Sequence, residues 1–176
     1  MNKKNKTKYK LIFIYFLITL LFTACNKDIA SNNAEMLDII KETENDTRDI
    51  KECGIITLGD KLLIIGLSGE NEYNYSYYAG EFSINEDGKY KFQRTIPLYN
   101  IGWQLRTNMW ENGNVLLCNN YNATKVQIII KEAGNKKSTI TEEINEIPWV
   151  YYHNISDIHN YDIQYKFLDA KNEEVQ

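Results

Sequence analysis

The two histidines of the chain are the first residues to test for metal or catalytic chemistry. His153 and His159 stand on either side of Asp157, at a spacing that matches no established zinc motif. The same histidines could serve a serine nucleophile, but no serine lies in a Gly-x-Ser-x-Gly context. We therefore expect a polar loop at this point, with neither a metal site nor a bound cofactor.

Acidic residues leave one enzymatic alternative open. Glycosidases need only two carboxyl groups that flank a cleft. Such groups are available at Glu142, Glu143, Glu173, Glu174, Asp87 and Asp157. Nothing in the neighbouring sequence distinguishes any pair, and acidic side chains are common on solvated surfaces. We expect no catalytic residue and no enzyme, with an envelope hydrolase that uses two acids as the alternative.

Two cysteines in the body of the chain, Cys53 and Cys118, could form a disulfide if the domain is exported. Closing so long a loop would stabilise the fold by roughly 4 kcal/mol. The alternative is a pair of buried free thiols, each acting as a small apolar residue. Neither cysteine lies in a reactive-cysteine motif.

Aromatic residues are the only enrichment with a functional implication. Tyr73, Tyr75 and Tyr77 alternate along one predicted strand, and on a solvent-facing strand they could form a stacking platform for a peptide or glycan. The alternative is a sheet interior or edge, where tyrosine and tryptophan are favoured. Trp110 lies in Met-Trp-Glu-Asn-Gly-Asn, which predicts a loop, and this position makes its ring a further candidate for binding.

The chain from Gly54 onward is a succession of short segments with alternating polarity, separated by turn residues. The segments are 55–58, 61–67, 73–84, 90–96, 103–108, 115–118, 126–130, 138–144, 149–152 and 161–167. Their spacing of roughly ten residues predicts a mainly β fold: an antiparallel β-sandwich, Ig-like or barrel-like, of eight to ten strands.

A short helix and a polar tether are expected before the sandwich. Apolar residues lie on one side of a helical segment at 34–43, with Asn33 as its expected N-cap. Residues 26–33 are polar and have little to bury, which predicts a flexible tether.

The first 24 residues have the layout of a secretory signal peptide. A lysine-rich stretch without acids is followed by fourteen uncharged residues, Leu11 to Ala24, that end on a small side chain. As a helix this run would reach only about 21 Å, because each helical residue rises about 1.5 Å. It is too short for a permanent span of a hydrocarbon core of roughly 30 Å.

Residues 21–25, Leu-Phe-Thr-Ala-Cys, resemble a bacterial lipobox, the site where lipoprotein precursors are modified and cleaved. Phe22 stands where the pattern usually has leucine. The resemblance implies diacylglycerol on the Cys25 thiol and cleavage after Ala24. It also implies anchoring on the extracytoplasmic face of the cell membrane, where two acyl chains hold stably.

Removal of residues 1–24 would leave an acidic domain. Lys+Arg falls from 20 to 15 against 24 acids, so the formal charge changes from −4 to −9. Such a charge excludes nucleic acid as an expected partner. We expect residues 25–48 to contain the lipidated cysteine, tether and helix, and residues 49–176 to form the β-sandwich domain.

The part after the signal peptide loosely resembles small, uncharacterised β-sandwich lipoproteins of low-GC Gram-positive bacteria. The likeness rests on the lipobox, the tether and the strand-rich C-terminal part. It implies a surface lipoprotein that binds an envelope protein or peptide without catalysis. An immunity-type lipoprotein that sequesters a cationic peptide toxin is an alternative, which the acidic charge suits.

Overall fold

The computed structural model describes residues 28–71, 73–132, 135–156 and 161–175. Within these ranges the chain is mainly β, as predicted. The elements are β1 (Ile29–Ala30), α2 (Asn33–Thr43), β2 (Ile50–Leu58), β3 (Lys61–Ser68), β4 (Ser76–Ile84), β5 (Tyr90–Thr95), β6 (Tyr99–Gly102), β7 (Leu105–Trp110), β8 (Gly113–Cys118), β9 (Lys125–Glu132), β10 (Asn135–Glu143), β11 (Trp149–Asn154) and β12 (Tyr161–Leu168). In the described part of the chain no helix has the length and apolar character that crossing a membrane requires. The predicted signal peptide and Cys25 lie outside the described residues.

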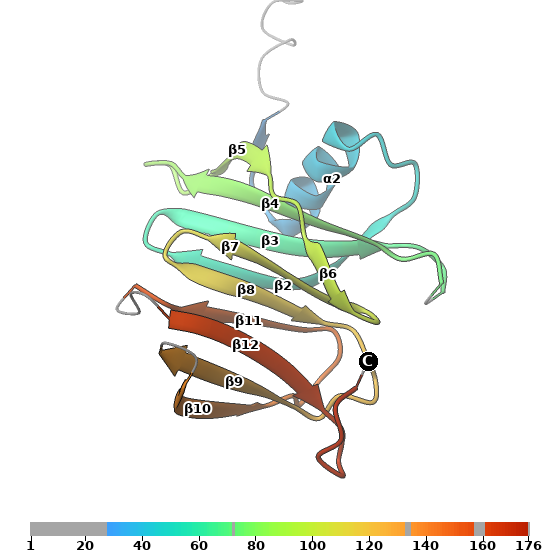
Figure 1. Cartoon of the computed structure of the whole chain (residues 1–176). Helices are drawn as coiled ribbons and strands as arrows, with labels where there is room; N and C mark the ends of the chain where they lie inside the picture. The colour runs from blue at the N-terminus through green and yellow to red at the C-terminus, as the bar shows by residue number, and fades with distance from the viewer. Residues whose placement is uncertain (1–27, 72, 133–134, 157–160, 176) are drawn as a thin grey trace, which may run out of the picture.

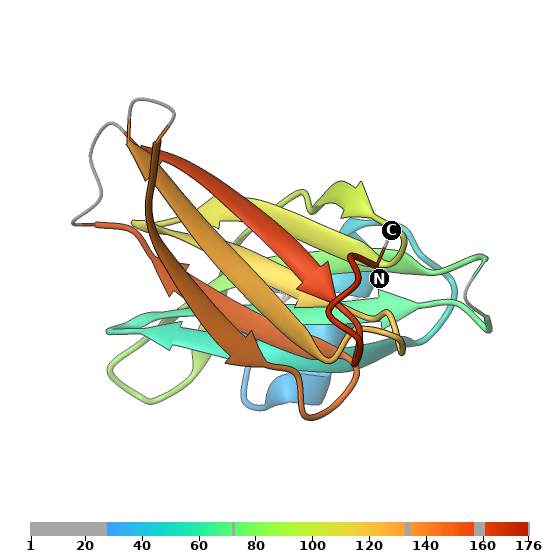
Figure 2. The same ribbon diagram turned by 60° about the horizontal axis from the view of Figure 1, so that its bottom comes forward.

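The strands form three antiparallel sheets that stack in layers (Figure 1). Sheet A has the order β1-β5-β4-β3-β2, sheet B the order β11-β8-β7-β6, and sheet C the order β10-β9-β12. Helix α2 covers one face of sheet A, and sheet B packs on the other face. Sheet C packs on the far side of sheet B, so the predicted sandwich gains a third sheet, as the turned view in Figure 2 also shows.

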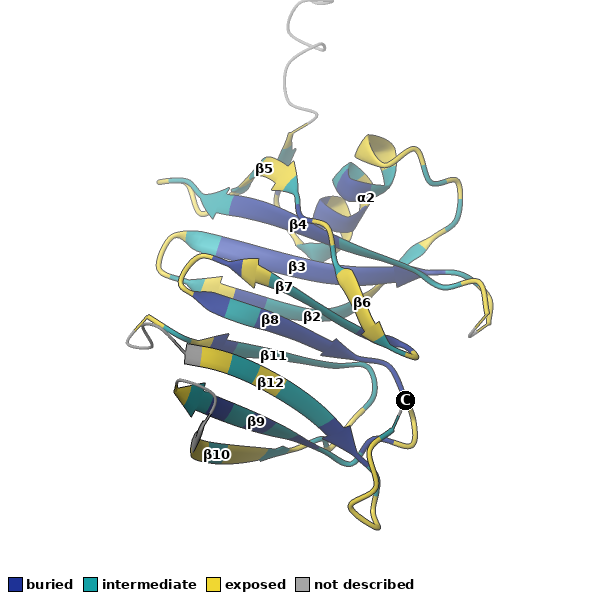
Figure 3. Cartoon of the chain, in the orientation of Figure 1, coloured by how far each residue is buried: buried dark blue, intermediate teal, exposed yellow. Residues whose placement is uncertain are grey.

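Strands β3 and β8 are buried on both faces because each lies in an inner layer. In β3, Leu63 packs toward sheet B and Ile64 toward α2. In β8, Leu117 packs toward sheet A and Leu116 toward sheet C. Two-sided burial accounts for the nearly continuous apolar sequence of both strands, which Figure 3 shows as mostly dark blue ribbons.

Helix α2 lies close against sheet A at a position without a side chain. A Cβ atom on Gly80 would lie 2.5 Å from Cδ1 of Ile40, so this approach requires glycine. The helix begins one residue earlier than predicted. Asn32 is its N-cap instead of Asn33, and the Asn32 side chain accepts a hydrogen bond from the Glu35 amide at 3.0 Å.

Twelve strands lie within the described residues, whereas eight to ten were predicted. The difference comes from β1 and β6, whose two and four residues are too short to show an alternating pattern. The tether prediction for residues 26–33 is wrong for Ile29 and Ala30, because β1 pairs with β5 and Ala30 is fully buried. Helix α2, predicted to precede the sandwich in sequence, packs on sheet A.

Candidate functional site

Aromatic side chains gather where the β3–β4 loop meets the β6–β7 turn. We call this group, Tyr73, Tyr75, Tyr77 and Trp103, the aromatic end. Tyr73 is 82 % exposed and Trp103 is 46 % exposed. Their ring centroids lie 5.8 Å apart, with the ring planes tilted by 54°. Two segments distant in sequence therefore present one exposed aromatic surface, and its tryptophan was not predicted to bind. The prediction that the three tyrosines alternate along one strand is wrong for Tyr73 and Tyr75, because β4 begins only at Ser76.

Tyr77 forms the half-buried base of the aromatic end. The guanidinium carbon of Arg106 lies 4.7 Å from the centroid of the Tyr77 ring, a cation–π distance. Asn119 donates a hydrogen bond from Nδ2 to the Tyr77 hydroxyl at 3.1 Å. Tyr75 contacts the same ring edge-on, with centroids 6.3 Å apart. Burial raises the pKa of Tyr77, so its hydroxyl stays protonated at neutral pH.

The turn that carries Trp103 is fixed by hydrogen bonds to the end of β8. The amide of Asn119 donates to the Gln104 carbonyl at 2.9 Å, and Asn120 Nδ2 donates to the Trp103 carbonyl at 3.3 Å. Gln104 has a positive φ of 57°, the left-handed conformation that a tight turn requires. Its buried Nε2 has no hydrogen-bond partner. The backbone under Trp103 is therefore held in place before any ligand arrives.

A charged network supports the β3–β4 loop from the α2 side of sheet A. Asp46 accepts hydrogen bonds from Arg48 at 2.8 Å, Ser68 at 2.6 Å and Tyr78 at 2.5 Å. Arg48 in turn donates to the Asn74 carbonyl at 3.0 Å. Arg48, followed by Ser68 and Tyr78, holds the pKa of Asp46 well below its usual range.

The low pKa of Asp46 decides its chemical role. A general base works best with a pKa near the working pH, whereas the pKa of Asp46 lies well below its usual range. Its three donors also occupy its oxygens. The network is therefore a structural support that fixes the backbone leading to Tyr75.

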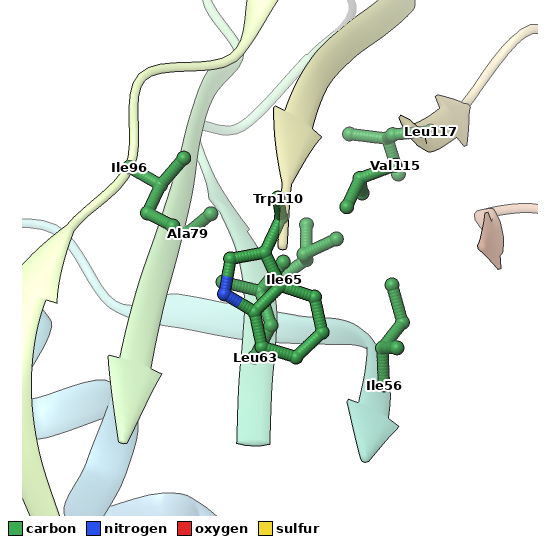
Figure 4. Packing of buried hydrophobic residues seen from close by; sticks show 8 residues of the cluster. All are labelled: Ile56, Leu63, Ile65, Ala79, Ile96, Trp110, Val115 and Leu117. Carbon is green, nitrogen blue, oxygen red and sulfur yellow. The ribbon is translucent and has the colours of Figure 1, made fainter. Parts of the chain in front are cut away.

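Trp110 is a core residue, and the loop prediction for it is wrong. Its side chain is 2 % exposed at the end of β7, packed among the residues shown in Figure 4. The ring meets Tyr152 edge-on, with centroids 5.9 Å apart. Only Glu111 and Asn112 separate β7 from β8, so the strand continues through the tryptophan. Trp110 is thus not available as a contact residue.

Both described cysteines are free thiols, so the disulfide alternative is not what the structure has. Burial, with a smaller contribution from Glu52, raises the pKa of Cys53 to about 12. Burial raises the pKa of Cys118 to about 11. Each thiol packs with apolar neighbours, Cys118 between sheets B and C and Cys53 against the core between sheets A and B.

His153 is a buried residue between sheets B and C. Its Nδ1 lies 3.1 Å from the Tyr165 hydroxyl, which also accepts a hydrogen bond from Asn114 Nδ2 at 2.6 Å. Burial lowers the pKa of His153. The other two members of the predicted polar loop, Asp157 and His159, lie outside the described residues. Among described side chains, no group of three or more His, Cys, Asp or Glu could hold a metal ion.

Two of the acidic residues considered for hydrolysis, Glu142 and Glu174, use their carboxylates in structural contacts. Glu142 accepts a hydrogen bond from the Tyr151 hydroxyl at 3.2 Å. Its neighbour Glu143 points to the opposite face of β10, because side chains alternate along a strand. Glu174 is paired with Lys166 at 2.6 Å. Asp87 lies in the β4–β5 turn, where its amide donates to Asn85 Oδ1.

Trp103, Arg106 and Asn119 are the members of the site that sequence reasoning missed. Trp103 was predicted to begin a strand and counted among the enriched aromatic residues but was not chosen as a binding residue, and no local pattern marks Arg106 or Asn119. The pairing of β7 with β8 continues to the hydrogen bond between Asn119 and Gln104. Arg106 and Asn119 thereby lie against Tyr77, whereas Trp103 lies against Tyr73. Comparison of the chain with protein-family profiles, curated proteins and solved structures returned no match.

Proposed function

We propose that the chain is a lipoprotein anchored through Cys25, and that its exported domain binds an envelope protein or peptide without catalysing a reaction. The aromatic end is the contact surface in this proposal. The observation that carries it is the exposed Tyr73–Trp103 pair on a fixed base. Tyrosine and tryptophan give large contact areas at low entropy cost and dominate many protein-binding surfaces.

The residues beneath the exposed rings of the aromatic end are held by several contacts, which supports a binding role for these rings. Tyr77 is held by Arg106 and Asn119, and the Trp103 carbonyl is held by Asn120. A contact surface that is ordered beforehand loses less conformational entropy when a partner binds. The exposed rings therefore need to order little beyond their own side chains.

Affinity capture tests the proposed contact surface. The full chain, solubilised in mild detergent, is immobilised and exposed to envelope extract, together with the variants Tyr73→Ala, Trp103→Ala and Tyr99→Ala. We expect each of the first two substitutions to weaken capture about fivefold to tenfold, because contact-surface aromatics commonly contribute 1 kcal/mol or more.

Tyr99→Ala is the matched control, since Tyr99 is 60 % exposed but lies at the other end of β6. The Tyr99→Ala variant should capture the same amount of envelope partner as the unchanged chain. Equal capture by all four proteins, or no capture above that of a denatured sample, would contradict the proposed contact surface.

Lipid labelling tests the anchor separately. Cells fed a radioactive fatty acid should label the unchanged chain, and Cys25→Ala should remove the label and release the protein from membranes. Cys53→Ala is the matched control, because Cys53 lies in β2 and outside the lipobox, and it should label normally. Label that persists in Cys25→Ala would refute the anchor.

The acidic charge supports one more specific version of this function. The formal charge of −9 after residue 24 suits a cationic partner. A lipoprotein that sequesters a cationic peptide toxin is therefore the second candidate. Protection of cells against such a peptide, lost with the aromatic-end variants, would favour it over binding of a resident envelope protein.

A further inference from the structure

Strand β4 is paired on both sides over only part of its length. Its partner β3 runs along all of it, whereas β5 reaches only from Ile84 to Gly80. The last contact on the β5 side is the Ile96 amide, which donates to the Ala79 carbonyl at 2.8 Å. Beyond that point the chain leaves sheet A for sheet B, so β4 has an open edge from Tyr77 toward the β3–β4 loop.

The alternation of the backbone decides which groups this open edge presents. The Ile84 amide donates to the Asp60 carbonyl at 2.7 Å, so even-numbered residues of β4 direct their amide and carbonyl groups toward β3. Pairing with β3 has no register shift, so the alternation holds along the strand. Odd-numbered residues face the other side, as Ala79 does. The N–H and C=O of Tyr77 therefore point out from the open edge.

A hollow of about 270 Å³ lies against this edge. Its walls are formed by Tyr77, Tyr78, Thr95, Ile96 and Pro97, and Glu44 stands at its rim. Pro97 has no amide hydrogen, so it cannot donate to a strand placed beside it. The hollow thus combines an unpaired strand edge, apolar walls and a carboxylate.

We infer that this edge of β4 binds an extended, cationic peptide segment, which adds to sheet A as a short strand beside Tyr77. This inference rests on the proposed binding function and names its mode. Strand addition supplies backbone hydrogen bonds for affinity, and a pocket beside the edge accepts an alternate side chain. The apolar walls take an aliphatic side chain, and Glu44 attracts a lysine or arginine of the same segment.

Charge around the hollow fits a cationic occupant. Glu44 is exposed and follows the end of α2, and the domain as a whole is acidic. The two nearby cations are already engaged. Arg48 is paired with Asp46 at 2.8 Å, and Arg106 lies over the Tyr77 ring. Asp46 neutralises the charge of Arg48, whereas Arg106 keeps its positive charge, so the attraction for a basic peptide comes from Glu44 and the acidic domain.

The test uses the hexapeptide Lys-Val-Lys-Val-Lys-Val, capped at both ends, with the full chain in detergent micelles. A second peptide of the same sequence is N-methylated at every residue, so it keeps the charges but has no backbone donors. We expect the first peptide to slow hydrogen exchange of the Tyr77 amide at least about tenfold. N-methylation should weaken binding about tenfold or more, through loss of backbone hydrogen bonds.

The role of charge is tested with Glu44→Gln, which should weaken binding of the hexapeptide about threefold to fivefold. Glu86→Gln is the matched control, since Glu86 lies in the β4–β5 turn at the other end of β4 and should leave binding unchanged. Equal binding of both peptides, or binding without protection of Tyr77, would overturn the inference.

Failure of the proposed function looks different. The chain could capture nothing from envelope extract and yet bind the hexapeptide with protection of the Tyr77 amide. That result would support the peptide site and contradict the proposed envelope partner. If capture depends on Tyr73 and Trp103 but the hexapeptide does not bind, the proposed function is supported and the strand-addition mode is overturned.

Discussion

Burial makes both described cysteine thiols weak nucleophiles. The reactive form is the thiolate, and pKa values of about 12 for Cys53 and about 11 for Cys118 leave almost none of it at pH 7.5. We predict that neither reacts with a thiol reagent such as Ellman's reagent in the native chain, and that both react once the chain is unfolded.

Cys25 gives this experiment an internal reference. A chain lipidated at Cys25 should show no reactive thiol in the native state, whereas the unlipidated chain should show one. Rapid native-state labelling at Cys53 or Cys118, located by mass spectrometry, would show that the surrounding packing opens readily.

Individual aromatic residues show where sequence reasoning succeeds and where it fails. The clustering of Tyr73, Tyr75 and Tyr77 was recognisable, because the three residues share one short segment. Trp110 was misplaced because Glu-Asn-Gly-Asn suggests a longer loop. The turn is instead made of Glu111 and Asn112 alone, with Glu111 at a φ of 51°. The position of a two-residue turn thus decides whether a neighbouring ring belongs to a loop or to the core.

At the scale of single elements, β8 and β9 differ in how many faces they bury. Leu116 and Leu117 of β8 are both fully buried, on opposite faces. In β9, Ile128 is fully buried but its neighbour Ile129 is only half-buried. We predict that Leu116→Ala, Leu117→Ala and Ile128→Ala each lower the free energy of unfolding by about 2–5 kcal/mol. Ile129→Ala should lower it by about 1 kcal/mol or less.

Urea denaturation of the four variants measures these differences. The comparison of neighbours is the decisive result, because they share local propensity and differ only in the face they occupy. The two losses should be similar in β8 and different in β9. Similar losses for Ile128→Ala and Ile129→Ala, or a small loss for one of the β8 variants, would contradict the layer assignment.

Elements with a clear period were predictable, and their covering layers were not. Alternation marked β9 and β12, and the apolar run of β3 marked a strand. An apolar strand that is buried on both faces must pack against another element on each face. The sequence around β3 does not identify α2 and sheet B as those two elements. The third sheet escaped prediction for the same reason. Long-range pairing and packing determine it, and a single sequence does not display them.

At the scale of the whole molecule, His153 couples the packing of sheet C on sheet B to pH. Burial lowers its pKa, so the unfolded chain binds a proton more readily than the folded chain. The stability that neutral His153 contributes is complete above the unfolded pKa of about 6.5 and declines as pH falls below it. The slope from one such group is at most about 1.4 kcal/mol per pH unit.

We therefore predict that the free energy of unfolding falls between pH 7.5 and pH 5.5 by more in the unchanged chain than in His153→Gln. Urea denaturation at several pH values gives both curves, and their difference isolates His153 from the acidic residues. Parallel curves would show that His153 takes up its proton equally well in the folded chain.

If Cys25 carries the proposed lipid, the pairing of β1 with β5 also limits how far the domain can stand from the bilayer. The Phe92 amide donates to the Asp28 carbonyl at 2.7 Å, and Asp28 is three residues after Cys25 in the sequence. Consecutive Cα atoms are about 3.8 Å apart, and three such steps reach roughly 11 Å at most. With lipid on Cys25, sheets A, B and C would lie at increasing distances from the membrane. The β1–β5 edge would sit among the headgroups, and sheet C, at the opposite side of the molecule in Figure 1, would be the first surface that an approaching molecule meets.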